Sequence, residues 1–203
     1  MAGSAAHNRR SLFHLLINLM ENLETRLNEV ARIAVRLEQQ TACPVQLLIA
    51  QWAIESKWGE KPVGHANYFG VKRAARHTQW CTVTTREVVN GKSVIENMEF
   101  ADYDSLADSC RDYAWLITQG APYCAAWARY QADRDLHALI EAVAGIYATD
   151  PNYARLCTTI AGQANVAQAI AEALQEAPTD ATAILTPQTG GAPKSAEIVA
   201  SRP

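Results

Sequence analysis

The sequence places one acidic residue, Glu55, in a segment whose other residues suit a buried helix. The segment is LLIAQWAIESKWGE, residues 47–60. At helical spacing Glu55 follows Trp52 by three residues and Leu48 by seven, so it lies at the edge of an apolar face. Partial burial there would raise the carboxyl pKa, as the general acid of a glycosidase requires. Helical geometry alone favours the alternative, a solvated glutamate that pairs with Lys57.

The composition is that of a globular protein with one main domain. The chain has 203 residues, 49% of them hydrophobic, and a formal net charge of -3. It can bury a sizeable core, and it has no basic field to attract nucleic acid or an anionic membrane. The apolar run over residues 12–20 is too short to span a membrane and precedes no cleavage site. We therefore expect no signal peptide, no membrane insertion and no nucleic-acid partner.

The cysteine pattern indicates neither a disulfide scaffold nor a metal site. The five cysteines are irregularly spaced: Cys43, Cys81, Cys110, Cys124 and Cys157. None forms a CxxC pair, and no histidines show paired ligand spacing, so we expect no metal and no other cofactor. Cys43 stands just before Pro44 at a helix start, where the helix dipole would lower a thiol pKa. A cysteine peptidase or amidase using Cys43 therefore remains an alternative.

Hydrophobic periodicity predicts a mainly helical body. Apolar residues recur at helical spacing over residues 12–37, and a second helix is expected from Pro44 to about Trp58. A loop rich in glycine follows over residues 59–73. Further helices are expected over residues 106–118, 123–130, 135–147 and 151–174.

A single β-hairpin interrupts the helices. Two β-branched runs flank Asn90-Gly91, a dipeptide that favours the positive φ angles of a two-residue hairpin turn. With a turn of that length, Glu87 pairs with Val94.

Five segments, in order, resemble the motifs of bacterial peptidoglycan N-acetylglucosaminidases, glycoside hydrolase family 73, which includes the hydrolase domain of the flagellar rod cap. They are LLIAQWAIESKWGE, ANYFGVK, TTREVVNG, FADYDSLADSCRDYAWLI and YATDPNYARL, within residues 27–163. Their collinear order is more specific than any one motif. The resemblance implies a mainly α, lysozyme-like α+β fold in which a small β-hairpin lobe flanks a substrate groove.

The resemblance also assigns roles to residues. The catalytic acid falls on Glu55, a second acidic residue on Glu87 in the hairpin, and an active-site tyrosine on Tyr147. The residues expected to contact substrate are Asn67, Tyr68, Phe69, Gly70 and Tyr153. The sequence departs from the family pattern at Lys57, where glycine is usual, and at Ala66 and Tyr68, where asparagine and leucine are usual.

The sequence is compatible with three catalytic routes. Glu87 would act as a general base in an inverting enzyme or as a nucleophile in a retaining one, and the distance between the two carboxyl groups separates these cases. In a third route the 2-acetamido group of the substrate is the nucleophile, and Glu55 acts with Tyr147. Glu87 is otherwise a solvated strand residue, and Tyr147 otherwise a core residue.

The implied activity is cleavage of the β-1,4 bond between N-acetylglucosamine and N-acetylmuramic acid in peptidoglycan. The alternatives are a muramidase or lytic transglycosylase on the same scaffold, the amidase above, and a non-catalytic peptidoglycan-binding module. The site of action would be the periplasm or cell wall, reached through a specialised secretion system or by lysis. An antibacterial effector of this kind would need an immunity protein as a partner.

The expected organisation has three parts. Residues 1–26 form a helical extension, residues 27–175 the lysozyme-like glucosaminidase domain, and residues 176–203 a flexible tail rich in Ala, Pro and Thr.

Overall fold

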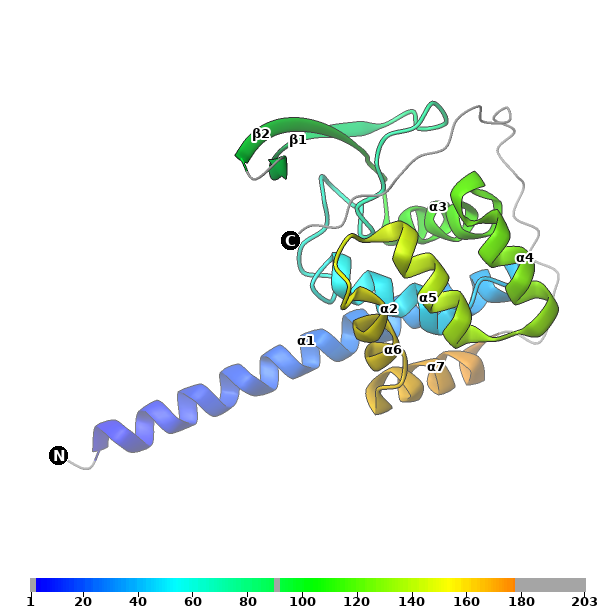
Figure 1. Cartoon of the computed structure of the whole chain (residues 1–203). Helices are drawn as coiled ribbons and strands as arrows, with labels where there is room; N and C mark the ends of the chain where they lie inside the picture. Colours follow the sequence, from blue (N-terminus) through cyan, green and yellow to red (C-terminus); the bar gives the residue numbers. More distant parts are fainter. Residues whose placement is uncertain (1–2, 90–91, 178–203) are drawn as a thin grey trace.

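A computed structural model describes residues 3–89 and 92–177, with side chains over residues 18–84 and 95–177. The helices are α1 (Gly3–Thr41), α2 (Val45–Glu55), α3 (Leu106–Gln119), α4 (Cys124–Asp133), α5 (Leu136–Tyr147), α6 (Tyr153–Ala161) and α7 (Ala164–Glu176), with a 3-10 turn, η1 (Ala121–Tyr123). Strands β1 (Trp80–Val89) and β2 (Lys92–Ala101) form one antiparallel hairpin. Figure 1 shows the hairpin beside a helical body, which confirms the predicted fold class.

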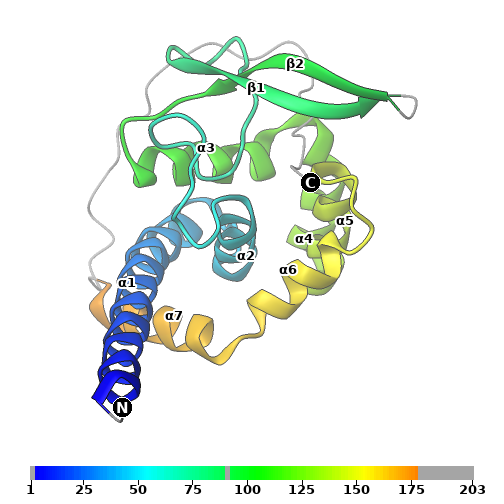
Figure 2. The same cartoon turned by 90° about the vertical axis from the view of Figure 1, so that its left-hand side faces the viewer.

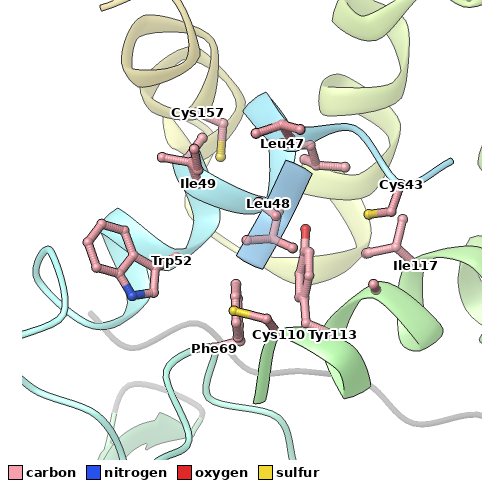
Figure 3. Close-up of a cluster of buried hydrophobic side chains, with 14 of the residues drawn as sticks. Cys43, Leu47, Leu48, Ile49, Trp52, Phe69, Cys110, Tyr113, Ile117 and Cys157 are labelled. Carbon is pink, nitrogen blue, oxygen red and sulfur yellow. The ribbon is translucent and has the colours of Figure 1, made fainter. Parts of the chain in front are cut away.

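Helix α2 is the centre of the helical body. It contacts α1, α3, α6 and α7, and Figure 2 shows it between them. Its apolar side chains join one cluster with residues of the neighbouring elements (Figure 3), and Leu48, Ile49 and Trp52 have no exposed surface. Trp52 therefore belongs to the core. Burial of this helix fixes the position of the residue at its end, Glu55.

The α2 helix ends at Glu55, three residues before the predicted end at Trp58. The hydroxyl of Ser56 donates to the carbonyl of Trp52 and accepts from the N–H of Gly59. The three residues that follow Ser56 have positive φ: Lys57 at 52°, Trp58 at 58° and Gly59 at 79°. This left-handed turn stops the helix, and it explains why glycine suits position 57 better than lysine does.

The predicted helix over residues 151–174 is wrong, because the structure has two helices there. Helix α6 ends at Ala161 and α7 begins at Ala164, with Gly162 and an extended Gln163 between them. The break allows α6 to pack on α2 and α5 while α7 packs along α1. Periodicity missed it because apolar residues continue at helical spacing through both helices.

The first helix crosses the expected boundary between residues 26 and 27 without a break. Its burial begins at Leu27, whereas Leu19 and Met20 are exposed. Figure 1 shows its N-terminal half extending away from the body. No helix among the described residues is long and apolar enough to span a membrane.

The hairpin has the predicted register. Glu87 pairs with Val94, and Val89 pairs with Lys92, so two residues connect the strands. Asn90 and Gly91 themselves lie outside the described residues. At the other end of the hairpin, the N–H of Ala101 donates to the carbonyl of Val71, and the N–H of Arg73 donates to the carbonyl of Glu99. The loop that precedes the hairpin is thus bonded to β2.

We predict that Lys57→Gly stabilises the protein. A lysine in the left-handed conformation costs roughly 1–2 kcal/mol, and the substitution removes this cost. The greater freedom of glycine in the unfolded chain offsets part of the resulting gain in stability. The expected net gain in the free energy of unfolding is up to about 1 kcal/mol, measured by urea denaturation. Lys57→Ala is the control, because it removes the exposed charge and keeps the strain. Equal stability of the two variants would contradict the explanation.

Candidate active site

The carboxyl group of Glu55 stands at the end of the buried helix α2 and is half-buried. Its Oε1 atom accepts a hydrogen bond from the hydroxyl of Tyr153, at 2.5 Å. Its Oε2 atom lies on the side of Gly70, where a Cβ added to the glycine would be 3.8 Å away. Gly70 has a φ of 66°, a conformation that glycine adopts without strain. A backbone without a side chain therefore borders one oxygen of Glu55, and a tyrosine holds the other.

The two tyrosines of the YATDPNY motif differ in their contacts. Tyr147 ends α5 and Tyr153 begins α6, and their rings stack with centroids 6.1 Å apart. Tyr153 donates to Glu55, whereas Tyr147 has no exposed surface and donates to the backbone carbonyl of Phe69. The catalytic role predicted for Tyr147 remains a prediction. In this structure its hydroxyl fixes the loop beside Glu55.

Burial sets the protonation of both tyrosines. It raises the pKa of Tyr147 and of Tyr153 well above the ordinary value, and the nearby charge of Glu55 raises both further. Each phenol therefore keeps its proton near neutral pH and serves as a donor.

The loop predicted to contact substrate is held from inside by Asn67. The Asn67 side chain is buried; it donates to the carbonyls of Val71 and Ala101 and accepts the N–H groups of Phe69 and Val71. Phe69 is also buried and stacks on Tyr113 at 4.2 Å between centroids. Both side chains face the interior, and the contact with substrate predicted for them stays a prediction. They position Gly70.

Tyr68, another of the predicted contacts, is half-buried. Its N–H donates to the hydroxyl of Ser109 on α3, and burial raises its pKa. Tyr68 is thus the member of the predicted loop that lies nearest the surface, whereas Gly70 is buried beside Glu55. Contact of either residue with substrate remains a prediction.

Glu87 lies near the far end of the hairpin, opposite Val94. Its side chain is outside the described residues, so the distance between its carboxyl group and that of Glu55 is outside them too. The role predicted for Glu87 therefore stays a prediction.

The segment between this loop and the hairpin is anchored by Asp112 on α3. The carboxylate accepts both the Nε and a terminal nitrogen of Arg76, at 3.0 and 3.1 Å, as well as Nε2 of His77 and the hydroxyl of Tyr103. The other ring nitrogen of His77 accepts the N–H of Ala74, which assigns the Nε2–H tautomer. Burial alone would raise the Asp112 pKa, but the hydrogen bonds from His77 and Arg76 and the charge of Arg76 lower it to about 2.

The cysteine alternative loses its physical basis. Cys43 is buried, and burial raises the pKa of its thiol, opposite to the expected effect of the helix dipole. All five cysteines are free thiols, Cys110 and Cys124 included. Among the residues with described side chains, no group of three His, Cys, Asp or Glu lies together as a metal site would require.

Two residues of the site, Gln51 and Tyr113, were not predicted from the sequence. Gln51 has no exposed surface, donates to the oxygen of Tyr153 at 3.0 Å and accepts the hydroxyl of Tyr113. The available signal was its spacing, because a polar residue four positions before Glu55 in an apolar helix lies beside it.

The fold is that of a lysozyme-like glycoside hydrolase domain. A family model described as mannosyl-glycoprotein endo-beta-N-acetylglucosaminidase matches residues 31–166. The chain belongs to this glucosaminidase family, glycoside hydrolase family 73.

Similar proteins agree with this assignment. The peptidoglycan hydrolase FlgJ of Salmonella typhimurium is 36% identical over 145 residues, which are 68% of this chain and 44% of FlgJ. A probable N-acetylmuramidase of Lactococcus lactis is 30% identical over 70% of this chain and 34% of its own length. The catalytic domain of the Listeria monocytogenes autolysin Auto superposes with a TM-score of 0.63 at 27% identity, over 72% of this chain and 86% of that domain. The chain thus spans less than half of the curated relatives.

Acid should destabilise the protein through Asp112. Because its pKa is lowered in the folded protein, Asp112 stabilises the fold at pH values above about 4, the pKa of an aspartate in the unfolded chain. This stabilisation is lost as the pH falls through about 2. The shift corresponds to about 2 kcal/mol of unfolding free energy. Urea denaturation between pH 5 and pH 2 measures it, with Asp112→Asn as the comparison. A pH dependence in Asp112→Asn as steep as in the native protein would contradict this role.

Proposed function

We propose that the protein is a peptidoglycan hydrolase that cleaves the β-1,4 bond between N-acetylglucosamine and N-acetylmuramic acid, with Glu55 as the general acid. The observation that carries the proposal is the geometry of the Glu55 carboxyl group, with Oε1 held by Tyr153 and Oε2 beside Gly70. The substrate is inferred from the family and from the FlgJ relative, which is named a peptidoglycan hydrolase.

The proposed reaction begins with proton transfer from Glu55 to the oxygen of the scissile glycosidic bond. Partial burial favours the protonated form, while the hydrogen bond from Tyr153 favours the ionised form that is left after transfer. The bond to Tyr153 therefore becomes stronger as the proton leaves. Water then attacks the sugar with help from Glu87 as a general base, or the substrate's own 2-acetamido group attacks first.

A second candidate is a muramidase acting on the neighbouring bond. The observation that favours it is the Lactococcus lactis relative, which is named an N-acetylmuramidase. Both candidates use the same acid and differ in the sugar bound on the glycone side. The new reducing ends of the product distinguish them.

The substrate implies a site of action in the periplasm or cell wall. Delivery by a specialised secretion system or by lysis, and an immunity protein as partner, remain predictions.

Glu55→Gln should abolish most lytic activity without unfolding the protein. The amide has the size of the carboxyl group but no acid proton, so we expect digestion of purified peptidoglycan to slow by about 10²- to 10⁴-fold. The matched control is Glu141→Gln, an exposed glutamate on α5 that should keep native activity. An active Glu55→Gln variant would refute the assignment of the acid.

Mass spectrometry of the same digest identifies the bond. New reducing-end N-acetylglucosamine supports the proposed cleavage, whereas reducing-end N-acetylmuramic acid indicates the muramidase and a 1,6-anhydro product a lytic transglycosylase. Glu87→Gln separates the two routes for the second step. A loss as large as that of Glu55→Gln supports a direct role of Glu87, as general base or as nucleophile, and a retained rate supports attack by the acetamido group.

A further inference from the structure

A buried amide, Gln51, connects two tyrosines to the carboxyl group of Glu55. Gln51 lies on α2, four residues before Glu55, and has no exposed surface. It accepts the hydroxyl of Tyr113 on α3 and donates to the oxygen of Tyr153 at 3.0 Å. Tyr153 in turn donates to Oε1 of Glu55 at 2.5 Å. A continuous chain of hydrogen bonds thus crosses from α3 through α2 to α6 and returns to the end of α2.

The chemistry of the amide sets the direction of this chain. An amide nitrogen only donates, so the oxygen of Tyr153 accepts from Gln51, and the single proton of the phenol is left for Glu55. Burial raises the pKa of Tyr153 and of Tyr113 well above the ordinary value, which keeps both phenols protonated near neutral pH. The chain therefore presents a donor to Oε1 of Glu55.

We propose that Gln51 is a positioning residue for the acid, because it directs the Tyr153 proton to Oε1 of Glu55. The Oε2 atom, beside Gly70, is then the oxygen that carries and delivers the catalytic proton. This inference rests on the proposed role of Glu55 as the general acid. A donor favours the ionised carboxylate, and successive hydrogen bonds strengthen one another. Gln51 thus influences the protonation of Glu55 through Tyr153.

Two buried titratable groups whose pKa values the charge of Glu55 raises, Tyr147 and Cys157, carry no charge at neutral pH. Tyr147 on α5 and Cys157 on α6 have pKa values raised first by burial and then by the charge of Glu55, that of the thiol to about 12. Tyr113 on α3 donates to Gln51, which donates to the oxygen of Tyr153, the residue bonded to Glu55. A change in the titration of Glu55 after substitution of Gln51 therefore does not come from a change in the charge of Tyr147 or Cys157.

The test compares Tyr153→Phe, Gln51→Met and the double variant with the native protein. Two quantities are measured: the midpoint of the Glu55 carboxyl titration by ¹³C NMR, assigned with Glu55→Gln, and the alkaline limb of the pH–rate profile on purified peptidoglycan. Loss of the donor raises the midpoint, and because the protonated acid is the active form, the alkaline limb moves to higher pH. We expect a rise of about one pH unit for Tyr153→Phe and a smaller rise for Gln51→Met.

The double variant provides the decisive comparison. If Gln51 acts through Tyr153, adding Gln51→Met to Tyr153→Phe produces no further shift. Additive shifts, or an unchanged midpoint in Gln51→Met, would overturn the inference. A midpoint that shifts while the alkaline limb stays fixed would support the hydrogen-bond chain and contradict the proposed role of Glu55 as the acid.

Two controls separate this effect from damage to the fold. Tyr123 belongs to the same buried region, and its hydroxyl has no hydrogen-bond partner among the residues with described side chains. Tyr123→Phe should therefore leave the Glu55 midpoint unchanged, and a shift as large as that of Gln51→Met would overturn the inference. Gln51→Met leaves the Tyr113 hydroxyl unpaired, so Gln51→Met/Tyr113→Phe removes both partners and should show the same midpoint shift in a more stable protein.

Discussion

The hydrogen bond between Tyr153 and Glu55 joins α6 to α2 at the point where the proposed chemistry occurs. Glu55 is the last residue of the central helix α2, and Tyr153 is the first residue of α6, which packs on α2. Each side chain has little freedom, since its helix is fixed by the buried cluster on either side. Correct packing of α2 against α6 is therefore what holds the acid in place.

The loop over residues 67–71 depends on the same arrangement. Asn67 folds it from inside, and the hydroxyl of Tyr147 holds the carbonyl of Phe69, so that Gly70 comes to lie beside Glu55. Asn67, for which substrate contact is predicted, thus supports the loop beside Glu55 from inside. This matches the expectation that an acid must be held by groups whose own conformations are fixed.

The sequence predicted the fold because the fold depends on local patterns, whereas the proposed role of Glu55 came from the resemblance to the family and not from helical spacing. Apolar periodicity located the helices, Asn90-Gly91 located the hairpin, and the register placed Glu87 opposite Val94. The break at Gly162 and the early end of α2 escaped prediction, since both depend on how the chain turns and not on which residues are apolar. The inward orientation of Asn67 and Phe69 and the contact of Gln51 with two tyrosines depend on tertiary packing, which spacing along one helix does not reveal.

The most direct measurement of the central claim is a crystal structure of Glu55→Gln with a bound peptidoglycan oligosaccharide. The account predicts that the scissile glycosidic oxygen lies about 3 Å from the side-chain atom of residue 55 that faces Gly70, while Tyr153 contacts the other atom. A glycan bound with its scissile oxygen on the Tyr153 side, or away from residue 55 altogether, would contradict it.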